Sequence, residues 1–373
     1  MSKYIFLQNI VSPYRVSFFN ELNETSFDFE VLYMSKTESG RDWDVPEDSI
    51  KFDYYIDQGF YKQILRFHIH FNYKLLLRII LSSDKDVILG GSWNDLNVIA
   101  LVLLKKYGIL RNRLHFWSEA NNLTIGSIND NYFKAILRRF IFNSADGFFI
   151  IPGRMSAITF THWGIINKKF VNLPNTISEE LFVITHDDLF LRSKNILPVF
   201  IIPARLHEQS KGIINFFNSI GKENTLKGIF LIPGSGPDKK AISDFIKSEN
   251  LTQNIQLLGF RPLNEMVKIY KQANIFILPS FSDPSPLSLV EALSMHLPLL
   301  VSERCGNHYE AVVTGENGYL FNPSKPNTIK DAFEDLLYRR LDWQTMGEKS
   351  FHLYKQIFKK DMVVNNFIKS MNS

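Results

Sequence analysis

The sequence predicts an α/β protein made of two Rossmann-like, doubly wound domains that face each other across a cleft. Between residues 197 and 330, short apolar runs alternate with segments of helical spacing, as in "IFILPS" followed by "SLVEALSMH". Such alternation is typical of βαβ units around a buried parallel sheet. The first half repeats it less cleanly, with runs such as "YIFLQN" and "DVILGG". The length of 373 residues also suits two domains.

The composition is that of an ordinary globular protein, with 45% hydrophobic and 21% charged residues. The single cysteine, Cys305, excludes an intrachain disulfide and fits a reducing compartment. The apolar part of the N-terminus is too short for a signal peptide. Apolar runs such as "VIALVLL" (98–104) fall short of the roughly 20 residues that cross a bilayer. We therefore expect a cytoplasmic protein without a transmembrane span.

The alternation also suggests domain boundaries. We expect a first domain at residues 1–178, a second at 179–350, and a C-terminal helix at 351–373 that crosses back onto the first domain. The stretch 176–196 interrupts the alternation and predicts a linker. Because ligands of open α/β sheets bind at the carboxyl ends of the strands, the cleft between the domains is the expected site.

One short stretch, "SDPSPLSLVEA" (282–292), places two acids near the start of a helix. Ser285 and Pro286 predict the N-cap and first turn. Asp283 then lies just before the helix N-terminus, and Glu291 lies inside the helix. A helix N-terminus suits a diphosphate, and carboxylates accept hydrogen bonds from sugar hydroxyls. The alternative is an acid in a turn followed by a solvated acid on a helix.

Two cations and two glycines form a second group of candidates. Arg205 ends a predicted strand and Lys211 opens the next helix, a placement that suits a diphosphate clamp. Gly234 and Gly236 in "PGSGP" stand between a strand and a helix, where they would let the backbone approach a phosphate. Solvated charges and a tight turn are the respective alternatives.

Taken together and in this order, "PARLHEQSKG", "PGSGP", "LLGF", "LPSFSDPSPLSLVEA" and "GNHYEAV" resemble the nucleotide-sugar domain of glycosyltransferase family 4 (group 1). Members of that family are retaining enzymes of the GT-B fold. The resemblance covers most of residues 197–330. The first half is similar to the family more loosely, through "SPYR" (12–15), "DVILGG" (86–91) and "NLPNTI" (172–177).

The resemblance implies roles for these residues. The family has two acids with seven residues between them, which here are Asp283 and Glu291. The first would contact the transferred sugar and the second the nucleotide ribose, while Arg205 and Lys211 would hold the diphosphate. The donor-binding set that it implies is Gly234, Gly236, Phe260, Pro284, Ser285, Pro286, Leu287, Ser288 and Glu291.

Two features of the acidic stretch depart from the family pattern. The first acid of the family is usually Glu, so Asp283 is one methylene shorter. Pro284 stands where the family often has Gly, and it lacks an N–H donor.

In the first domain, "LHFWSEANN" ends a predicted strand at the cleft. The resemblance makes Glu119 the candidate for contact with the transferred sugar, with a solvated loop acid as the alternative. His115 lies inside the strand and is expected to be packed. Ser12, Arg15 and Gly91 complete the first-domain side of the expected cleft.

We expect neither a metal site nor a cofactor, because the nucleotide-sugar would be a substrate. "DWD" (42–44) and "DKD" (84–86) imitate the metal-binding acids of the other glycosyltransferase fold, but "DKD" precedes a strand instead of ending one. His68 and His70 stand two apart without a third ligand nearby.

The formal net charge of +4 is too mild to indicate nucleic-acid binding. Residues 58–140, however, carry 12 Lys/Arg against 5 Asp/Glu. Lys74 and Arg78 lie four apart on one predicted helix beside leucines and isoleucines, a pattern that suits an anionic membrane surface. The alternative is the solvated face of a helix that packs on the sheet.

The expected function is metal-independent transfer of a hexose, with retention, from a nucleotide-diphosphate sugar to a glycan or lipid-linked acceptor. The expected setting is the synthesis of bacterial surface polysaccharide, such as O-antigen, lipopolysaccharide or capsule, at the inner face of the cell membrane. Two alternatives remain: a nucleotide-sugar epimerase of the same fold, and a non-catalytic nucleotide-binding relative.

Overall fold

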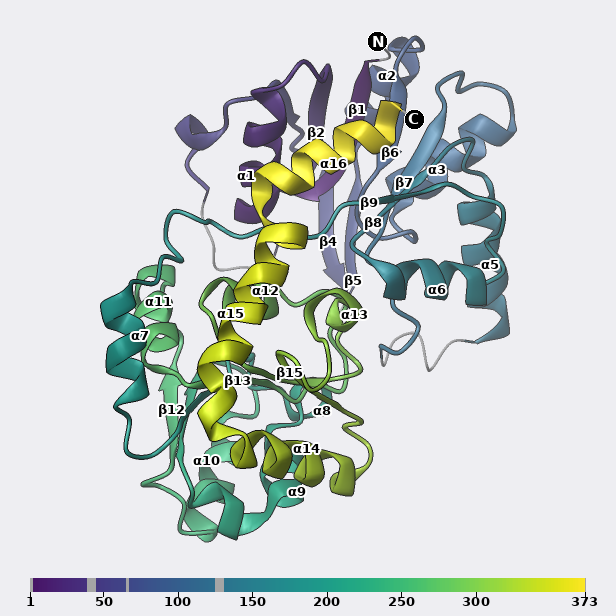
Figure 1. Cartoon of the computed structure of the whole chain (residues 1–373). Helices are drawn as coiled ribbons and strands as arrows, with labels where there is room; N and C mark the ends of the chain where they lie inside the picture. The colour runs from purple at the N-terminus through teal and green to yellow at the C-terminus, as the bar shows by residue number, and fades with distance from the viewer. Residues whose placement is uncertain (1–2, 39–44, 65–66, 125–130, 373) are drawn as a thin grey trace.

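The computed structural model describes residues 3–38, 45–64, 67–124 and 131–372 and shows two α/β domains (Figure 1). Over these residues the first domain has a seven-stranded sheet in the order β3-β2-β1-β6-β7-β8-β9. The second has a six-stranded sheet in the order β12-β11-β10-β13-β14-β15. Every pairing in both sheets is parallel. The predicted fold class is confirmed.

The strands of the first sheet are β1 (Tyr4–Ile10), β2 (Phe29–Ser35), β3 (Tyr54–Ile56), β6 (Asp86–Leu89), β7 (Leu114–Trp117), β8 (Phe149–Ile151) and β9 (Phe170–Asn172). An antiparallel hairpin of β4 (Phe60–Ile64) and β5 (Phe67–Phe71) lies outside it. The second sheet contains β10 (Val199–Ile201), β11 (Ile229–Pro233), β12 (Ile255–Gly259), β13 (Ile275–Leu278), β14 (Leu299–Ser302) and β15 (Gly318–Phe321).

The helices up to the second sheet are α1 (Pro13–Asn23), α2 (Tyr73–Leu81), α3 (Leu96–Lys106), α5 (Tyr132–Asn143), α6 (Arg154–His162) and α7 (His186–Ser193). Those that follow are α8 (Glu208–Lys211), α9 (Ile213–Thr225), α10 (Lys239–Ser248), α11 (Leu263–Gln272), α12 (Leu287–Ser294), α13 (His308–Ala311), α14 (Pro326–Tyr338), α15 (Trp343–Leu353) and α16 (Lys360–Asn372). Short 3₁₀ turns lie at Glu47–Ser49 and Arg340–Asp342, and a π-helical turn lies at Tyr354–Phe358. In the described ranges, no helix is long and apolar enough to cross a lipid bilayer.

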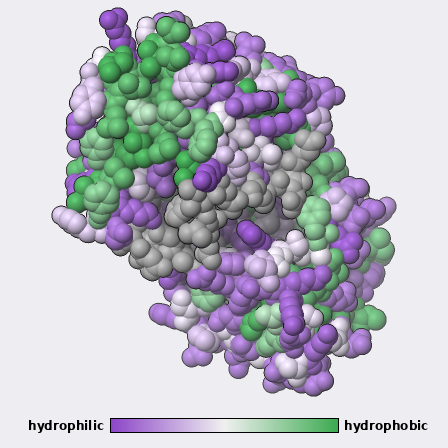
Figure 2. Space-filling model, turned by 180° about the vertical axis from the view of Figure 1, so that it is seen from behind, coloured by the Kyte–Doolittle hydropathy of each residue, from purple (hydrophilic) through white to green (hydrophobic). Residues whose placement is uncertain are grey.

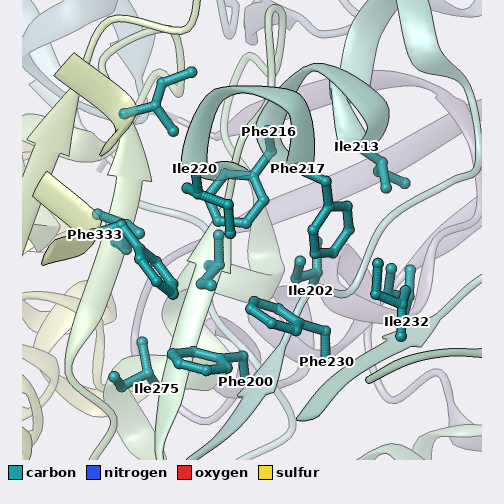
Figure 3. Close-up of a cluster of buried hydrophobic side chains, with 14 of the residues drawn as sticks. Phe200, Ile202, Ile213, Phe216, Phe217, Ile220, Phe230, Ile232, Ile275 and Phe333 are labelled. Atoms are coloured by element: carbon teal, nitrogen blue, oxygen red, sulfur yellow. The ribbon is translucent and has the colours of Figure 1, made fainter. Parts of the chain in front are cut away.

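The core of the second domain is rich in aromatic rings. Phe200 of β10 stacks on Phe230 of β11 with 4.5 Å between ring centroids. Phe216 of α9 and Phe333 of α14 pack on the same cluster (Figure 3). A parallel strand is buried on both faces, so its sequence is apolar throughout, as "IFIL" in β13 illustrates.

The first sheet is covered on its two faces by different parts of the chain. Helices α2, α3, α5 and α6 pack on one face. On the other, α1 is joined by α16, the last helix, which crosses back from the second domain (Figure 1). Phe367 of α16 is fully buried, with ring centroids 5.8 Å from Phe18 and 5.6 Å from Phe27.

The stretch 176–196, predicted as a linker, is partly helical. Thr185 and Asp188 form a capping box at the start of α7. The guanidinium of Arg192 is buried and donates hydrogen bonds to the backbone carbonyls of Tyr270 and Met295. Helix α7 is therefore part of the second domain.

We predict that Phe367→Ala lowers the free energy of unfolding by about 3–5 kcal/mol, because it leaves a cavity between α16 and α1. Urea unfolding followed by circular dichroism measures this loss. Leu341→Ala is the control, since Leu341 is 98% exposed and its truncation should change the free energy by less than about 0.5 kcal/mol. Equal effects of the two substitutions would contradict the packing of α16.

Candidate functional site

The two domains contact each other at the carboxyl ends of their strands. Asn175, three residues after β9, is almost fully buried. Its Nδ2 donates to Glu119 Oε1 at 3.0 Å and lies 3.2 Å from the Oγ of Ser285 in the second domain. The sequence therefore predicted both Glu119 and Ser285 at the cleft, whereas Asn175 itself was not a candidate.

Arg15 and Glu119 form an ion pair in the first domain. Arg15 Nη2 donates to Glu119 Oε1 at 3.0 Å. The guanidinium also lies 3.7 Å from the centroid of the Trp117 ring, a cation–π contact that fixes its position. Arg15 is held in the first turn of α1, whose N-cap is Ser12. Glu119 is thus an anchored acid and not the solvated loop acid of the alternative interpretation.

The candidate residues of the first domain line one cavity of about 230 Å³. They are Ser12, Arg15, Gly91 and Glu119. Gly91 has φ +89, and a Cβ there would lie 1.7 Å from Asn9 Oδ1, so glycine is required.

Two lining residues, Gln8 and Trp117, were missed by the sequence analysis. Gln8 Nε2 and Trp117 Nε1 are buried donors with no hydrogen-bond partner among the described residues. A buried N–H without a partner is costly, and these two donors are unsatisfied polar groups in the wall of the cavity.

In the second domain, Lys211 and Asp283 form an ion pair between the end of α8 and the loop after β13. Their side chains are 17% and 14% exposed, respectively. The amides of Phe281 and Ser282 donate to the carbonyl of Ser210 at 2.8 and 3.1 Å and hold the loop against α8. Lys211, predicted to bind the diphosphate, and Asp283, predicted to bind the transferred sugar, are therefore neighbours. Arg205 is exposed and forms no ion pair with the described residues.

The start of α12 differs from the prediction. The helix begins at Leu287 with Pro286 as its N-cap, so the assignment of Ser285 as N-cap was wrong. Pro286 has φ −65 and ψ 121, the extended geometry of a cap residue. Ser285 lies one residue earlier, where its hydroxyl meets Asn175. The first amides of the helix, at Leu287 and Ser288, follow Pro286 and lie close in sequence to Asp283.

The glycines of "PGSGP" serve a close approach between two loops. A Cβ on Gly234 would lie 1.9 Å from the carbonyl oxygen of Ala204, and one on Gly236 would lie 2.4 Å from that of Leu206. This packing is a structural reason for both glycines. Phe260, after β12, is 66% exposed at the same edge of the sheet.

Glu291 lies in α12 and its carboxylate accepts a hydrogen bond from the buried Tyr270 hydroxyl at 2.8 Å. Burial raises the pKa of Glu291 to about 7, and the hydrogen bond from Tyr270 partly opposes this rise. The sequence analysis missed Tyr270, which comes from α11, because only the fold brings that helix beside α12.

A second contact joins the domains at α6. Glu310 Oε1 of α13 accepts from the backbone N–H of Arg154 at 2.6 Å, at the N-terminus of α6. The Arg154 guanidinium lies 4.9 Å from the centroid of the Tyr309 ring. Burial raises the pKa of Glu310. A carboxylate at a helix N-terminus is favourable, so this contact holds the domains together.

The motifs set aside as metal sites have structural roles where they are described. Asp86 of "DKD" opens β6 and lies 3.3 Å from His115 Nε2. His115 is buried and stacks on Phe148, as expected. His70 Nε2 lies 3.0 Å from Glu38 Oε1. "DWD" (42–44) and the side chain of His68 lie outside the described residues, which contain no group of three His, Cys, Asp or Glu arranged to hold a metal.

Residues 190–351 match the protein family described as glycosyl transferases group 1. The second domain is therefore similar to the group 1 glycosyl transferases over most of its length. This agrees with the resemblance found in the second-domain motifs, from "PARLHEQSKG" to "GNHYEAV", which lie within the matched residues.

Among curated proteins, an uncharacterized glycosyltransferase of Methanocaldococcus jannaschii is 27% identical over 240 residues, which cover 61% of this chain and 58% of that protein. The UDP-Gal:α-D-GlcNAc-diphosphoundecaprenol α-1,3-galactosyltransferase of Escherichia coli is 30% identical over 224 residues, which cover 53% of this chain and 55% of that protein. The chain thus spans less than two thirds of the length of these relatives.

Two solved structures show that the whole chain shares the GT-B architecture. Sucrose-phosphate synthase from Thermosynechococcus elongatus superimposes with a TM-score of 0.75 at 14% identity, over 99% of this chain and 98% of that one. Anabaena HepE in complex with UDP gives 0.73 at 14% identity, over 99% of each chain. The group 1 domain is therefore one half of a GT-B fold.

We predict that Glu291 makes the stability of the protein pH-dependent near neutrality. Because the pKa of Glu291 is raised in the folded state, the folded protein keeps this proton at pH values at which the unfolded chain has lost it. The free energy of unfolding is therefore highest at acidic pH and falls as the pH rises to about 7. The whole loss amounts to about 3 kcal/mol. Relative to Glu291→Gln, the wild-type protein should lose stability between pH 5 and pH 8.

Chemical denaturation at both pH values measures this difference. Glu265→Gln, a surface carboxylate on the neighbouring α11, is the matched control and should behave as the wild type does. The assignment fails if Glu291→Gln and the wild type change by the same amount between the two pH values.

Proposed function

We propose that the protein is a retaining, metal-independent glycosyltransferase that moves a hexose from a nucleotide-diphosphate sugar to a glycan or lipid-linked acceptor. The observation that carries this proposal is the line of polar residues across the cleft of a protein with a group 1 domain. Asn175 joins Ser285 to Glu119, and Asp283, which pairs with Lys211 of α8, lies in the same loop as Ser285.

The donor would bind to the second domain. Lys211, Arg205 and the N-terminus of α12 would stabilise the negative charge that develops on the leaving diphosphate. Asp283, which forms an ion pair with Lys211, would accept a hydrogen bond from a hydroxyl of the transferred sugar. Glu291 would accept from the ribose hydroxyls, a role that favours its ionised form.

The acceptor would bind to the first domain, in the cavity that Gln8 and Trp117 help to line. Arg15 and Glu119 would orient its hydroxyl groups. Closure of the domains would exclude water and limit hydrolysis of the donor. The leaving phosphate would itself take the proton of the acceptor hydroxyl, so we assign no general base.

The proposed setting is bacterial surface polysaccharide synthesis at the inner face of the cell membrane. The E. coli relative is named for a diphosphoundecaprenol-linked acceptor, which supports a lipid-linked acceptor here. HepE has been solved with UDP, which makes UDP the first nucleotide to test.

We predict that one family of nucleotide diphosphates raises the thermal stability of the protein, by about 2.7 kcal/mol at a hundred times the dissociation constant. Lys211→Ala should weaken this stabilisation, because it removes the cation of the diphosphate site. Lys227→Ala, an exposed lysine of the same domain, is the control and should leave it unchanged. Differential scanning calorimetry with UDP, GDP, ADP and TDP measures the effect.

The outcomes separate the candidate functions. Stabilisation together with sugar transfer to an added acceptor supports the transferase. Turnover of the donor in the absence of any acceptor would favour the epimerase, and binding without turnover would favour the non-catalytic relative. Absence of stabilisation by all four nucleotides would contradict the donor site.

A further inference from the structure

Helices α2, α3 and α5 are apolar on the side that faces solvent as well as on the side that faces the sheet. We call this surface the α2–α3–α5 face. Its large exposed apolar side chains, on the helices and on the segment after α3, are Tyr73, Leu77, Leu81, Leu103, Tyr107, Ile109, Tyr132, Phe133 and Ile136. Figure 2 shows the resulting hydrophobic patch on the first domain.

A surface helix normally carries polar residues on its outer side. Helix α2, "YKLLLRIIL", has Lys74 and Arg78 as its only charged residues. Leu81 is 84% exposed, Phe133 of α5 75% and Leu77 53%. Single exposed apolar residues are common, but a contiguous patch marks an interaction surface.

The charges on this face have one sign. The three helices contain seven Lys or Arg and no Asp or Glu: Lys74, Arg78, Lys105, Lys106, Lys134, Arg138 and Arg139. Arg78 and Lys105 pair with Glu30 and Asp146, which lie on other elements. Lys74, Lys106 and Arg139 are exposed, and Arg111 and Arg113 follow α3. The face is therefore both apolar and cationic.

Among the common partners of a protein surface, an anionic bilayer fits this combination. Apolar tips enter the boundary between headgroups and acyl chains, while Lys and Arg reach the lipid phosphates from their apolar stems. We propose that the α2–α3–α5 face docks the protein on an anionic lipid bilayer. The helices lie along the bilayer surface and do not cross it.

This docking surface specifies which part of the protein would contact the membrane. Its link to the acceptor rests on the proposed function. Phe71, at the end of β5, directly precedes α2 and is 42% exposed. His70, beside it, contacts Glu38, which lines the first-domain cavity. The docked face therefore borders the cavity in which a lipid-linked acceptor would be bound.

Co-sedimentation with lipid vesicles tests the proposal. The wild-type protein should sediment with vesicles that contain phosphatidylglycerol and far less with pure phosphatidylcholine. The triple variant Leu77→Ser, Leu81→Ser, Phe133→Ser should partition into anionic vesicles more than about tenfold less, because it removes three apolar anchors. The matched control is Ile196→Ser, Tyr338→Ser, Leu341→Ser, three highly exposed apolar residues outside this face, and it should bind as the wild type does.

Charge is tested separately with Lys74→Gln, Lys106→Gln, Arg139→Gln, for which partition should fall about fivefold per charge removed. Both face variants should keep the thermal stabilisation by nucleotide, because the donor residues lie in the second domain. A failure of docking is thereby distinguished from a failure of the donor site.

Three results would overturn the proposal. The first is absence of wild-type binding to anionic vesicles, and the second is unchanged binding of the triple serine variant. The third is a wild-type dimer in sedimentation velocity that the serine variant converts to a monomer, since a second copy of the chain would then occupy the face.

Discussion

Both domains depend on one constraint of the parallel sheet, namely that all of its strands end at the same edge. In each domain the loops at that edge face the cleft. Ser12, Gly91 and Glu119 follow strands of the first sheet, and Arg205 and Asp283 follow strands of the second. The two edges face each other, so residues that are far apart in sequence meet through Asn175.

This constraint explains which features were predictable. Apolar runs mark the strands, and polar residues directly after them mark the cleft, so Glu119 and Asp283 were found. Tyr270 and Trp117 were not, because their roles depend on helix packing and cavity shape that no local pattern encodes. Ser285 was misassigned because the sequence does not show that Asn175, 110 residues away, lies near its hydroxyl. Helix α7 was missed because its buried side chain is Arg192, which breaks the apolar pattern.

The cleft and the α2–α3–α5 face differ in how their positive charges are compensated. In the cleft, Arg15 and Lys211 are each paired with a carboxylate, so the charge of each of these two cations is compensated locally. On the α2–α3–α5 face, cations have no acid on the same helices, so attraction is long-ranged and falls with salt. A modest net charge of +4 therefore conceals a strong local asymmetry.

The crossing of α16 has a consequence for how the chain folds as it is synthesised. The strands of the first sheet are complete by Asn172, yet Phe18 and Phe27 also pack against Phe367 of α16. A domain normally folds as soon as it leaves the ribosome. Here the first domain keeps an open apolar face until the entire second domain has been translated. Its last folding step therefore waits for the second domain, and until then the nascent first domain exposes this apolar face on its α1 side.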